Sequence, residues 1–155
     1  MVGTKTKIGI AVLVLLFLGI MYSLLVNQEG VDQTYLLPSG YEGCVVINYN
    51  VKGAPPLKIE NNIITYKVPP NGIINTSSPS DFGWVNEKHS GAYQLRAFYV
   101  DEKGEILEEL PQEKIRFGAI GASQEVGKAE KHYYYQIFGS EEVENRGCPD
   151  LIYRN

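Results

Sequence analysis

The sequence predicts a mostly β protein, in which one N-terminal transmembrane helix is followed by a small antiparallel β-sandwich or barrel-like domain. An uncharged apolar run, Ile8 to Val26, lies near the start of the chain. After it come about seven short segments rich in Val, Ile, Tyr and Phe, separated by Gly, Pro, Asn and Asp, which is the pattern of strands and turns. No amphipathic helical pattern of usable length interrupts these segments, and this favours two packed layers of sheet.

The apolar run is long enough to span a bilayer. It has 19 residues, and a helix that rises about 1.5 Å per residue then covers nearly 30 Å, the thickness of the hydrocarbon core. Lys5 and Lys7 precede the run, and all 18 acidic residues lie at or beyond Glu29. The basic flank of such a helix stays inside the cell. We therefore expect a cytoplasmic tail over residues 1–7, a membrane helix over 8–26 and the rest of the chain outside the cytoplasm.

Two alternatives to an uncleaved anchor are a signal peptide and a buried core helix. A signal peptide has an apolar region of about 7 to 15 residues followed by small residues at the cleavage site, whereas this run leads into Tyr22 to Asn27 without such a site. A core helix would carry a polar face, and the run is apolar on all sides. The anchor is therefore preferred, and a secreted form after cleavage is the alternative.

The exported part is expected to have a stalk over residues 27–34 and one β domain over residues 35–155. In Cys44 to Val51 apolar residues recur with period 2, and Val45, Ile47 and Tyr49 share the expected core face. The other strands are identified by the same pattern. The expected strands are Cys44 to Val51, Ile63 to Val68, Ile73 to Thr76, Ala92 to Val100, Glu105 to Leu110, Ile115 to Ile120 and His132 to Phe138.

A stretch of strand and turn residues carries a family resemblance. Pro38 to Tyr49 reads P-x-G-Y-x-G-x-V-x-I-x-Y, and it is followed by Gly53 to Leu57 and by Pro70 to Ser77. In these segments the chain resembles a family of bacterial, bacillus-type, membrane-anchored or secreted domains of unknown function. The resemblance implies an extracytoplasmic β domain and brings no catalytic motif with it.

Charge and residue spacing argue against several function classes. From Gly30 onward there are 12 basic and 17 acidic residues, a net charge of −5. Nucleic-acid binding depends on a basic stripe, so we expect no nucleic-acid partner. His89 and His132 lie in no metal-ligand spacing, and Gly121 to Glu125 lacks the second glycine of a nucleophile elbow. We therefore predict no metal, no cofactor and no catalytic residue.

The two cysteines form a candidate disulfide. Cys44 and Cys148 both lie in the exported part, and an oxidising compartment permits a bond between them. The alternative is two unpaired thiols, because the sequence does not give the Cα separation on which the bond depends.

An aromatic surface is the candidate binding site. Tyr133, Tyr134 and Tyr135 are consecutive on an expected strand, so they cannot all face the core. If Tyr133 and Tyr135 face inward, Tyr134 faces outward and forms a patch with His132 for a glycan, a peptide or a partner protein. Phe82 and Trp84, in a loop rich in Gly, Pro and Ser, are further candidate contacts; ordinary sheet packing is the alternative for all four residues.

Together these observations predict a membrane-anchored extracytoplasmic domain, single-pass with its N-terminus in the cytoplasm, that acts as a non-catalytic binding or structural module at the cell surface. Its expected partners are the bilayer, through Ile8 to Val26, and a cell-envelope protein or glycan. The alternative is an extracytoplasmic enzyme whose active site is not recognised.

Overall fold

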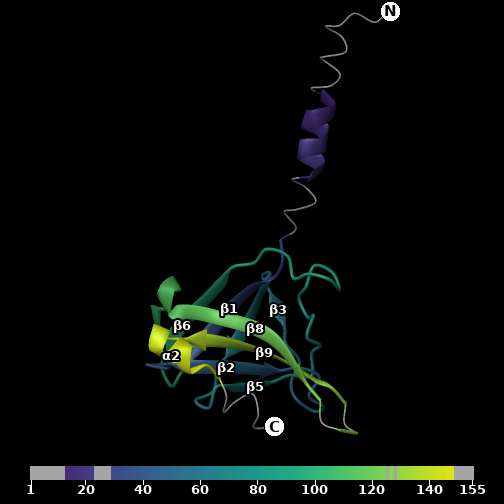
Figure 1. Cartoon of the computed structure of the whole chain (residues 1–155). Coiled ribbons are helices and arrows are strands. Elements are labelled where there is room, and N and C mark those ends of the chain that lie inside the picture. Colours follow the sequence, from purple (N-terminus) through teal and green to yellow (C-terminus); the bar gives the residue numbers. More distant parts are fainter. Residues whose placement is uncertain (1–12, 23–28, 125, 128, 149–155) are drawn as a thin grey trace, which may run out of the picture.

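The computed structural model describes residues 13–22, 29–124, 126–127 and 129–148. Figure 1 shows two layers of β-sheet, with the strands β5, β2, β9 and β8 in front of β1, β3 and β6. Nine strands, one 3-10 turn and one short helix make up the domain within these residues. They are β1 (Asp32–Pro38), β2 (Gly43–Asn48), β3 (Ile59–Glu60), β4 (Ile63–Lys67), β5 (Ile73–Asn75), β6 (Leu95–Val100), β7 (Ile106–Glu109), η1 (Gln112–Lys114), β8 (Ile115–Ser123), β9 (Lys131–Phe138) and α2 (Glu141–Arg146).

The predicted transmembrane helix is wrong. In the described part of the chain, the apolar run forms a helix over residues 13–22, drawn in purple in Figure 1. Among the residues that the structure describes, no helix is both long and apolar enough to cross a membrane. Residues 8–12 and 23–26 of the predicted span lie outside the described residues.

The mostly β class and the two-sheet architecture are confirmed, but the sheets are mixed rather than antiparallel. The five-stranded sheet has the order β3-β4-β1-β6-β7, and the four-stranded sheet has the order β5-β2-β9-β8. β1 pairs in parallel with both β4 and β6, and β2 pairs in parallel with β5. β1 begins at Asp32, inside the range 27–34 that was expected to be a stalk.

The core lies between the two sheets, and alternating residues of each strand point into it. Val45 and Ile47 of β2, Ile64 and Tyr66 of β4 and Ala97 of β6 are buried there, in the alternation that the sequence predicts. The face of each sheet that points away from this core is called its outer face below. Burying such residues stabilises the fold by roughly 1.5–3 kcal/mol for each large side chain.

Strand β9 has the opposite orientation from the one predicted. Phe138 and Tyr134 pack in the core between the sheets, so Tyr135 and Ile137, which alternate with them, face away from it. Ile137 and Tyr135 pack instead with a second apolar cluster on the outer face of the four-stranded sheet. The prediction that Tyr133 and Tyr135 face the core and Tyr134 faces outward is therefore wrong.

Helix α2 covers one end of that outer face. Val143 of α2 is buried against Ile137, Cys44 and Cys148. The structure joins Cys44 and Cys148 in a disulfide, with 5.7 Å between their Cα atoms. This bond ties the segment that follows α2 to β2. The carboxylate of Glu144 also accepts a hydrogen bond from the Arg116 guanidinium of β8 at 2.8 Å.

Buried tyrosines make the stability of the fold sensitive to alkaline pH. Burial raises the pKa of Tyr49 to about 12, against the opposing effect of its hydrogen bond with Tyr66. Burial also raises the pKa of Tyr66 and of Tyr134. Above about pH 10, the ordinary pKa of tyrosine, the unfolded chain releases protons that the folded chain retains, so folding becomes less favourable.

We therefore expect the free energy of unfolding to hold level with respect to these groups up to about pH 10 and to fall from there to about pH 12. Urea titrations across this interval measure the slope. In the Tyr49→Phe variant the slope should be smaller, because phenylalanine has no proton to release. An identical slope in the two proteins would show that Tyr49 titrates in the same way in the folded and unfolded chains.

Candidate binding site on the four-stranded sheet

A row of four residues crosses the outer face of the four-stranded sheet at the end that α2 does not cover. Asn75 of β5 pairs with Asn48 of β2. Asn48 pairs in turn with Tyr133 of β9, and Tyr133 pairs with Gly121 of β8. These four residues are called the Asn–Tyr row. Because directly opposed residues have their Cβ atoms about 4.5–5.5 Å apart, the side chains of the row are neighbours.

The two asparagines of the row hold each other in place. The Nδ2 of Asn48 donates a hydrogen bond to the Oδ1 of Asn75 at 2.9 Å. An amide side chain has two donor hydrogens and an acceptor oxygen. This bond does not use the Oδ1 of Asn48, which is an acceptor, or the Nδ2 of Asn75, which is a donor, and the pair lies on an exposed surface.

The ring of Tyr133 lies over Gly121. A Cβ atom added at Gly121 would meet the Cζ, Oη and Cε2 atoms of Tyr133, so a residue with a side chain at this position would displace the ring. Tyr133 is half-buried. The glycine thus covers one side of the ring and leaves the tyrosine partly open to a ligand.

A groove of about 500 Å³ lies beside the row. It contains amide, phenol, imidazole and charged groups, so it offers both hydrogen-bond donors and acceptors. The imidazole Nε2 of His132 lies 3.7 Å from the Oε2 of Glu130. The residues that line the groove are Asn48, Tyr49, Asn50, Val51, Asn75, Ala129, Glu130, Lys131 and His132.

Backbone hydrogen bonds fix the wall of the groove. The amide of Tyr49 donates to the carbonyl of His132 at 3.0 Å, and the amide of Val51 donates to the carbonyl of Thr76 at 2.9 Å. Thr76 is itself buried, and its hydroxyl donates to the carbonyl of Pro55 at 2.9 Å. Asn50 has a φ of 56°, in the left-handed region that asparagine tolerates, so the chain turns sharply out of β2 at this point. The wall is therefore a built part of the fold.

The structure separates the four residues of the predicted aromatic surface. His132 lines the groove, and its role in binding stays a prediction. Tyr134 points inward, where its hydroxyl donates a hydrogen bond to the Oε1 of Gln136 at 2.7 Å. Phe82 packs against the core. Trp84 is half-buried in the same loop as Phe82, and neither residue lines the groove.

The sequence interpretation missed Asn48, Asn75 and Tyr133. Asn48 and Asn75 are 27 positions apart, and only the parallel pairing of β2 with β5 brings them together. A usable signal was present in Asn48-Tyr49-Asn50, where polar residues interrupt an apolar strand. Such residues at a strand end point to an exposed polar edge.

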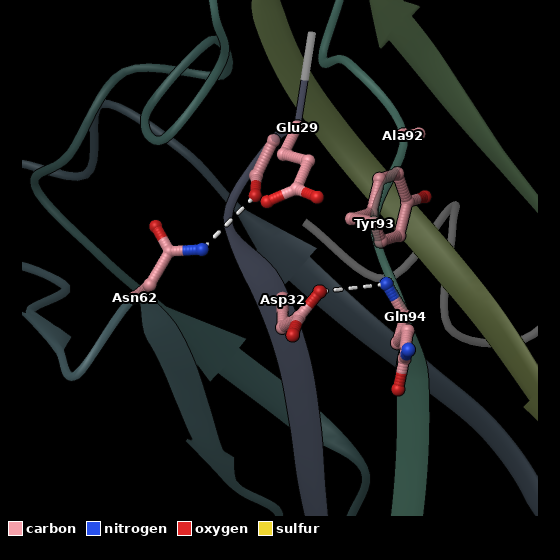
Figure 2. A pocket seen from close by; sticks show the side chains of 7 residues that line it. Glu29, Asp32, Asn62, Ala92, Tyr93 and Gln94 are labelled. Carbon is pink, nitrogen blue, oxygen red and sulfur yellow. Dashed lines mark hydrogen bonds between the residues drawn. The ribbon is translucent and has the colours of Figure 1, made fainter. Parts of the chain in front are cut away.

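A second, smaller pocket lies where the chain enters the domain. It has a volume of about 290 Å³ and contains the carboxylates of Glu29 and Asp32. Figure 2 shows that residues lining this pocket hydrogen-bond to one another. The Oδ1 of Asp32 accepts a hydrogen bond from the amide of Gln94 at 2.8 Å, and the Nδ2 of Asn62 donates to the carbonyl of Gly30 at 3.2 Å.

These hydrogen bonds join the start of β1 to the segments beside it, so the second pocket has a structural explanation. No group of three or more His, Cys, Asp or Glu side chains that could hold a metal ion occurs within the described ranges. The groove beside the Asn–Tyr row is therefore the stronger candidate site.

Comparisons with known proteins agree with this architecture. A crystal structure from Bacillus anthracis, described as a "Putative Lipoprotein", matches with a TM-score of 0.58 and 25% sequence identity. The match covers 72% of this chain and 75% of that one. No curated protein matches the sequence. The model of a family of unknown function, DUF6843, matches residues 29–147, and these span all nine strands and α2. The chain therefore belongs to the DUF6843 family of unknown function.

Proposed function

We propose that this protein is an extracytoplasmic, non-catalytic module that binds a component of the bacterial cell envelope through the groove and the Asn–Tyr row. The observation that carries this proposal is the groove itself, with its fixed wall and the hydrogen-bonded pair Asn48 and Asn75 in its lining. The half-buried Tyr133 does not line the groove but lies opposite Asn48 on the neighbouring strand. Ligand sites commonly combine such a concave surface with a few well-placed polar groups.

The disulfide supports a location outside the cytoplasm. Disulfides persist in oxidising compartments and are rare in the cytosol. The similar structure from Bacillus anthracis is described as a lipoprotein, and a protein of that kind belongs to the cell envelope. In this chain Cys44 and Cys148 are joined to each other.

The composition of the groove favours binding over catalysis. None of the described residues that line it is a serine, threonine or cysteine, and these are common nucleophiles of covalent catalysis. The imidazole of His132 lies near the carboxylate of Glu130. Both groups can form hydrogen bonds with a ligand. The three amide groups suit hydrogen bonding to a polar ligand.

Sedimentation with isolated envelopes tests this function. The intact chain is mixed with envelopes of its source bacterium, and the bound fraction is compared with that of the double variant Asn48→Ala/Asn75→Ala. Each lost hydrogen bond to a ligand costs about 0.5–1.5 kcal/mol. The double variant should therefore bind roughly tenfold more weakly.

The matched control is Thr65→Ala, an exposed residue of β4 in the opposite sheet. This variant should bind as the wild type does, and thermal unfolding should show that both variants are folded. Envelope binding that survives the double substitution unchanged, or that is absent in the wild type, would contradict the proposed function.

A further inference from the structure

We propose that the ligand of the groove is an uncharged glycan strand of the envelope, which stacks on Tyr133 and hydrogen-bonds to Asn48 and Asn75. This inference rests on the proposed function and adds the chemical class of the ligand. It follows from the charge of the domain, from the hydrogen-bonding groups of the groove and from the placement of the tyrosine.

The charge distribution disfavours an anionic polymer. The chain from Gly30 onward carries a net charge of −5, so the domain as a whole repels polyanions. Among the described residues that line it, the groove has one carboxylate, on Glu130, and one ammonium, on Lys131. These two charges offset each other. A neutral ligand encounters no such repulsion.

The hydrogen-bonding groups match a chain of hydroxyls. Each sugar hydroxyl both donates and accepts a hydrogen bond, and a neighbouring amide donor and acceptor can serve one such group at a time. Asn48 and Asn75 supply both kinds of group: their mutual hydrogen bond engages the Nδ2 of Asn48 and the Oδ1 of Asn75, and each amide also has its second polar atom. Asn50 adds a third amide to the lining of the same groove.

The placement of Tyr133 suits stacking on a sugar ring. Gly121 lets the tyrosine ring lie against the sheet, and an aromatic ring held in this way presents an apolar surface beside polar neighbours. The groove has a volume of about 500 Å³, well within the range of about 300–1,000 Å³ for organic ligands. It therefore has room for a short segment of a glycan strand.

A protein partner fits the groove less well. The core of a protein interface is apolar and rich in large side chains. The exposed large apolar residues of the described domain include Ile106, Leu107, Phe117 and Ile120, and none of these lines the groove. The groove is lined by one tyrosine and two aliphatic residues, and the other six lining residues carry amide, imidazole or charged groups, which is more polar than the centre of a protein interface.

Selective treatment of the envelope distinguishes the ligand classes. Envelopes are digested with a protease, extracted with hydrofluoric acid to cleave phosphodiester-linked anionic polymers, or left untreated, and binding of the intact chain to each is measured. We expect binding to survive both treatments. Neutral oligosaccharides of N-acetylglucosamine should compete with binding to untreated envelopes.

Loss of binding after protease digestion would show a protein ligand, and loss after acid extraction would show an anionic polymer. Either result, or a failure of the oligosaccharides to compete, would overturn the glycan proposal. In each of these cases binding that still depends on Asn48 and Asn75 would leave the proposed function intact. Binding that does not depend on these residues would overturn both.

The variant Gly121→Ala tests the stacking surface. Its added methyl group would displace the Tyr133 ring, while the backbone at position 121 has no positive φ that would disfavour alanine. We expect Gly121→Ala and Tyr133→Ala each to weaken binding roughly tenfold, and Tyr133→Phe, which keeps the ring, to bind nearly as the wild type does.

The matched control is Phe117→Ala, which removes an exposed aromatic ring from the same sheet near α2. This variant should bind as the wild type does. Equal binding by the wild type and by the folded Tyr133→Ala protein would show that no ligand stacks on Tyr133 and would overturn the proposed mode of binding.

Discussion

Removal of the Cys44–Cys148 disulfide should lower the free energy of unfolding by about 4 kcal/mol. The bond joins residues that are 104 positions apart, and closing a loop of about 100 residues removes up to about 4.7 kcal/mol of chain entropy from the unfolded state. A small domain has only about 5–15 kcal/mol of stability in total. The reduced protein should therefore be only marginally stable.

Urea unfolding with and without a thiol reductant measures this effect. The double variant Cys44→Ala/Cys148→Ala should be as unstable as the reduced wild type, and the reductant should not change its unfolding midpoint. An oxidised wild type that unfolds at the same urea concentration as the double variant would contradict the account. Alkylation of two thiols in the untreated, denatured protein would show that the bond does not form.

Replacement of Phe138 by alanine should lower the free energy of unfolding by a similar amount. Phe138 is fully buried at the end of β9, and its ring lies 5.0 Å from that of Tyr35, which stacks on Tyr66 at 4.7 Å between ring centroids. These three rings join the two sheets at the centre of the core. Phe138→Ala should therefore cost about 4 kcal/mol, within the range for large-to-small changes of a buried aromatic residue.

The control for this prediction is Phe117→Ala, because Phe117 is 57% exposed on β8. Its contact with Tyr135 is an edge-of-sheet contact, with 6.0 Å between ring centroids. Such a surface substitution should cost well under about 1 kcal/mol. If the two variants unfolded at the same urea concentration, Phe138 would not occupy the core position described here.

The strands with one buried and one exposed face could be predicted from the sequence. In β4, Ile64 and Tyr66 are buried while Thr65 and Lys67 are exposed, so the period of 2 is visible in the residue types. The turn after β6 was predictable for the same local reason. Asp101 accepts hydrogen bonds from the amides of Lys103 and Glu105, as a turn aspartate commonly does.

The orientation of β9 could not be predicted in this way, because both of its faces are covered along the second half of the strand. Phe138 faces the core and Ile137 faces the cluster under α2. Tyrosine suits either environment, since its ring is apolar and its hydroxyl is polar. The residue pattern therefore did not distinguish the two orientations, and the wrong choice placed Tyr134 on the surface instead of Tyr133.

Elements that depend on distant partners were also missed. Strand β1 lies between β4 and β6, and its register follows from strands that come much later in the chain. Helix α2 has only six residues, too few to show helical periodicity. The Asn–Tyr row depends on the register of all four strands of its sheet, so local patterns could not reveal the site even where they identified each strand.

The most direct test of the binding surface is photo-crosslinking in intact cells. Benzoylphenylalanine is introduced in place of Ala129, an exposed residue that lines the groove, or in place of Thr65, on the opposite sheet. Our account predicts that the position 129 protein forms an adduct with envelope material on illumination and that the position 65 protein does not. Equal adducts from the two positions, or an adduct from position 65 alone, would show that the envelope is not bound through the outer face of the four-stranded sheet.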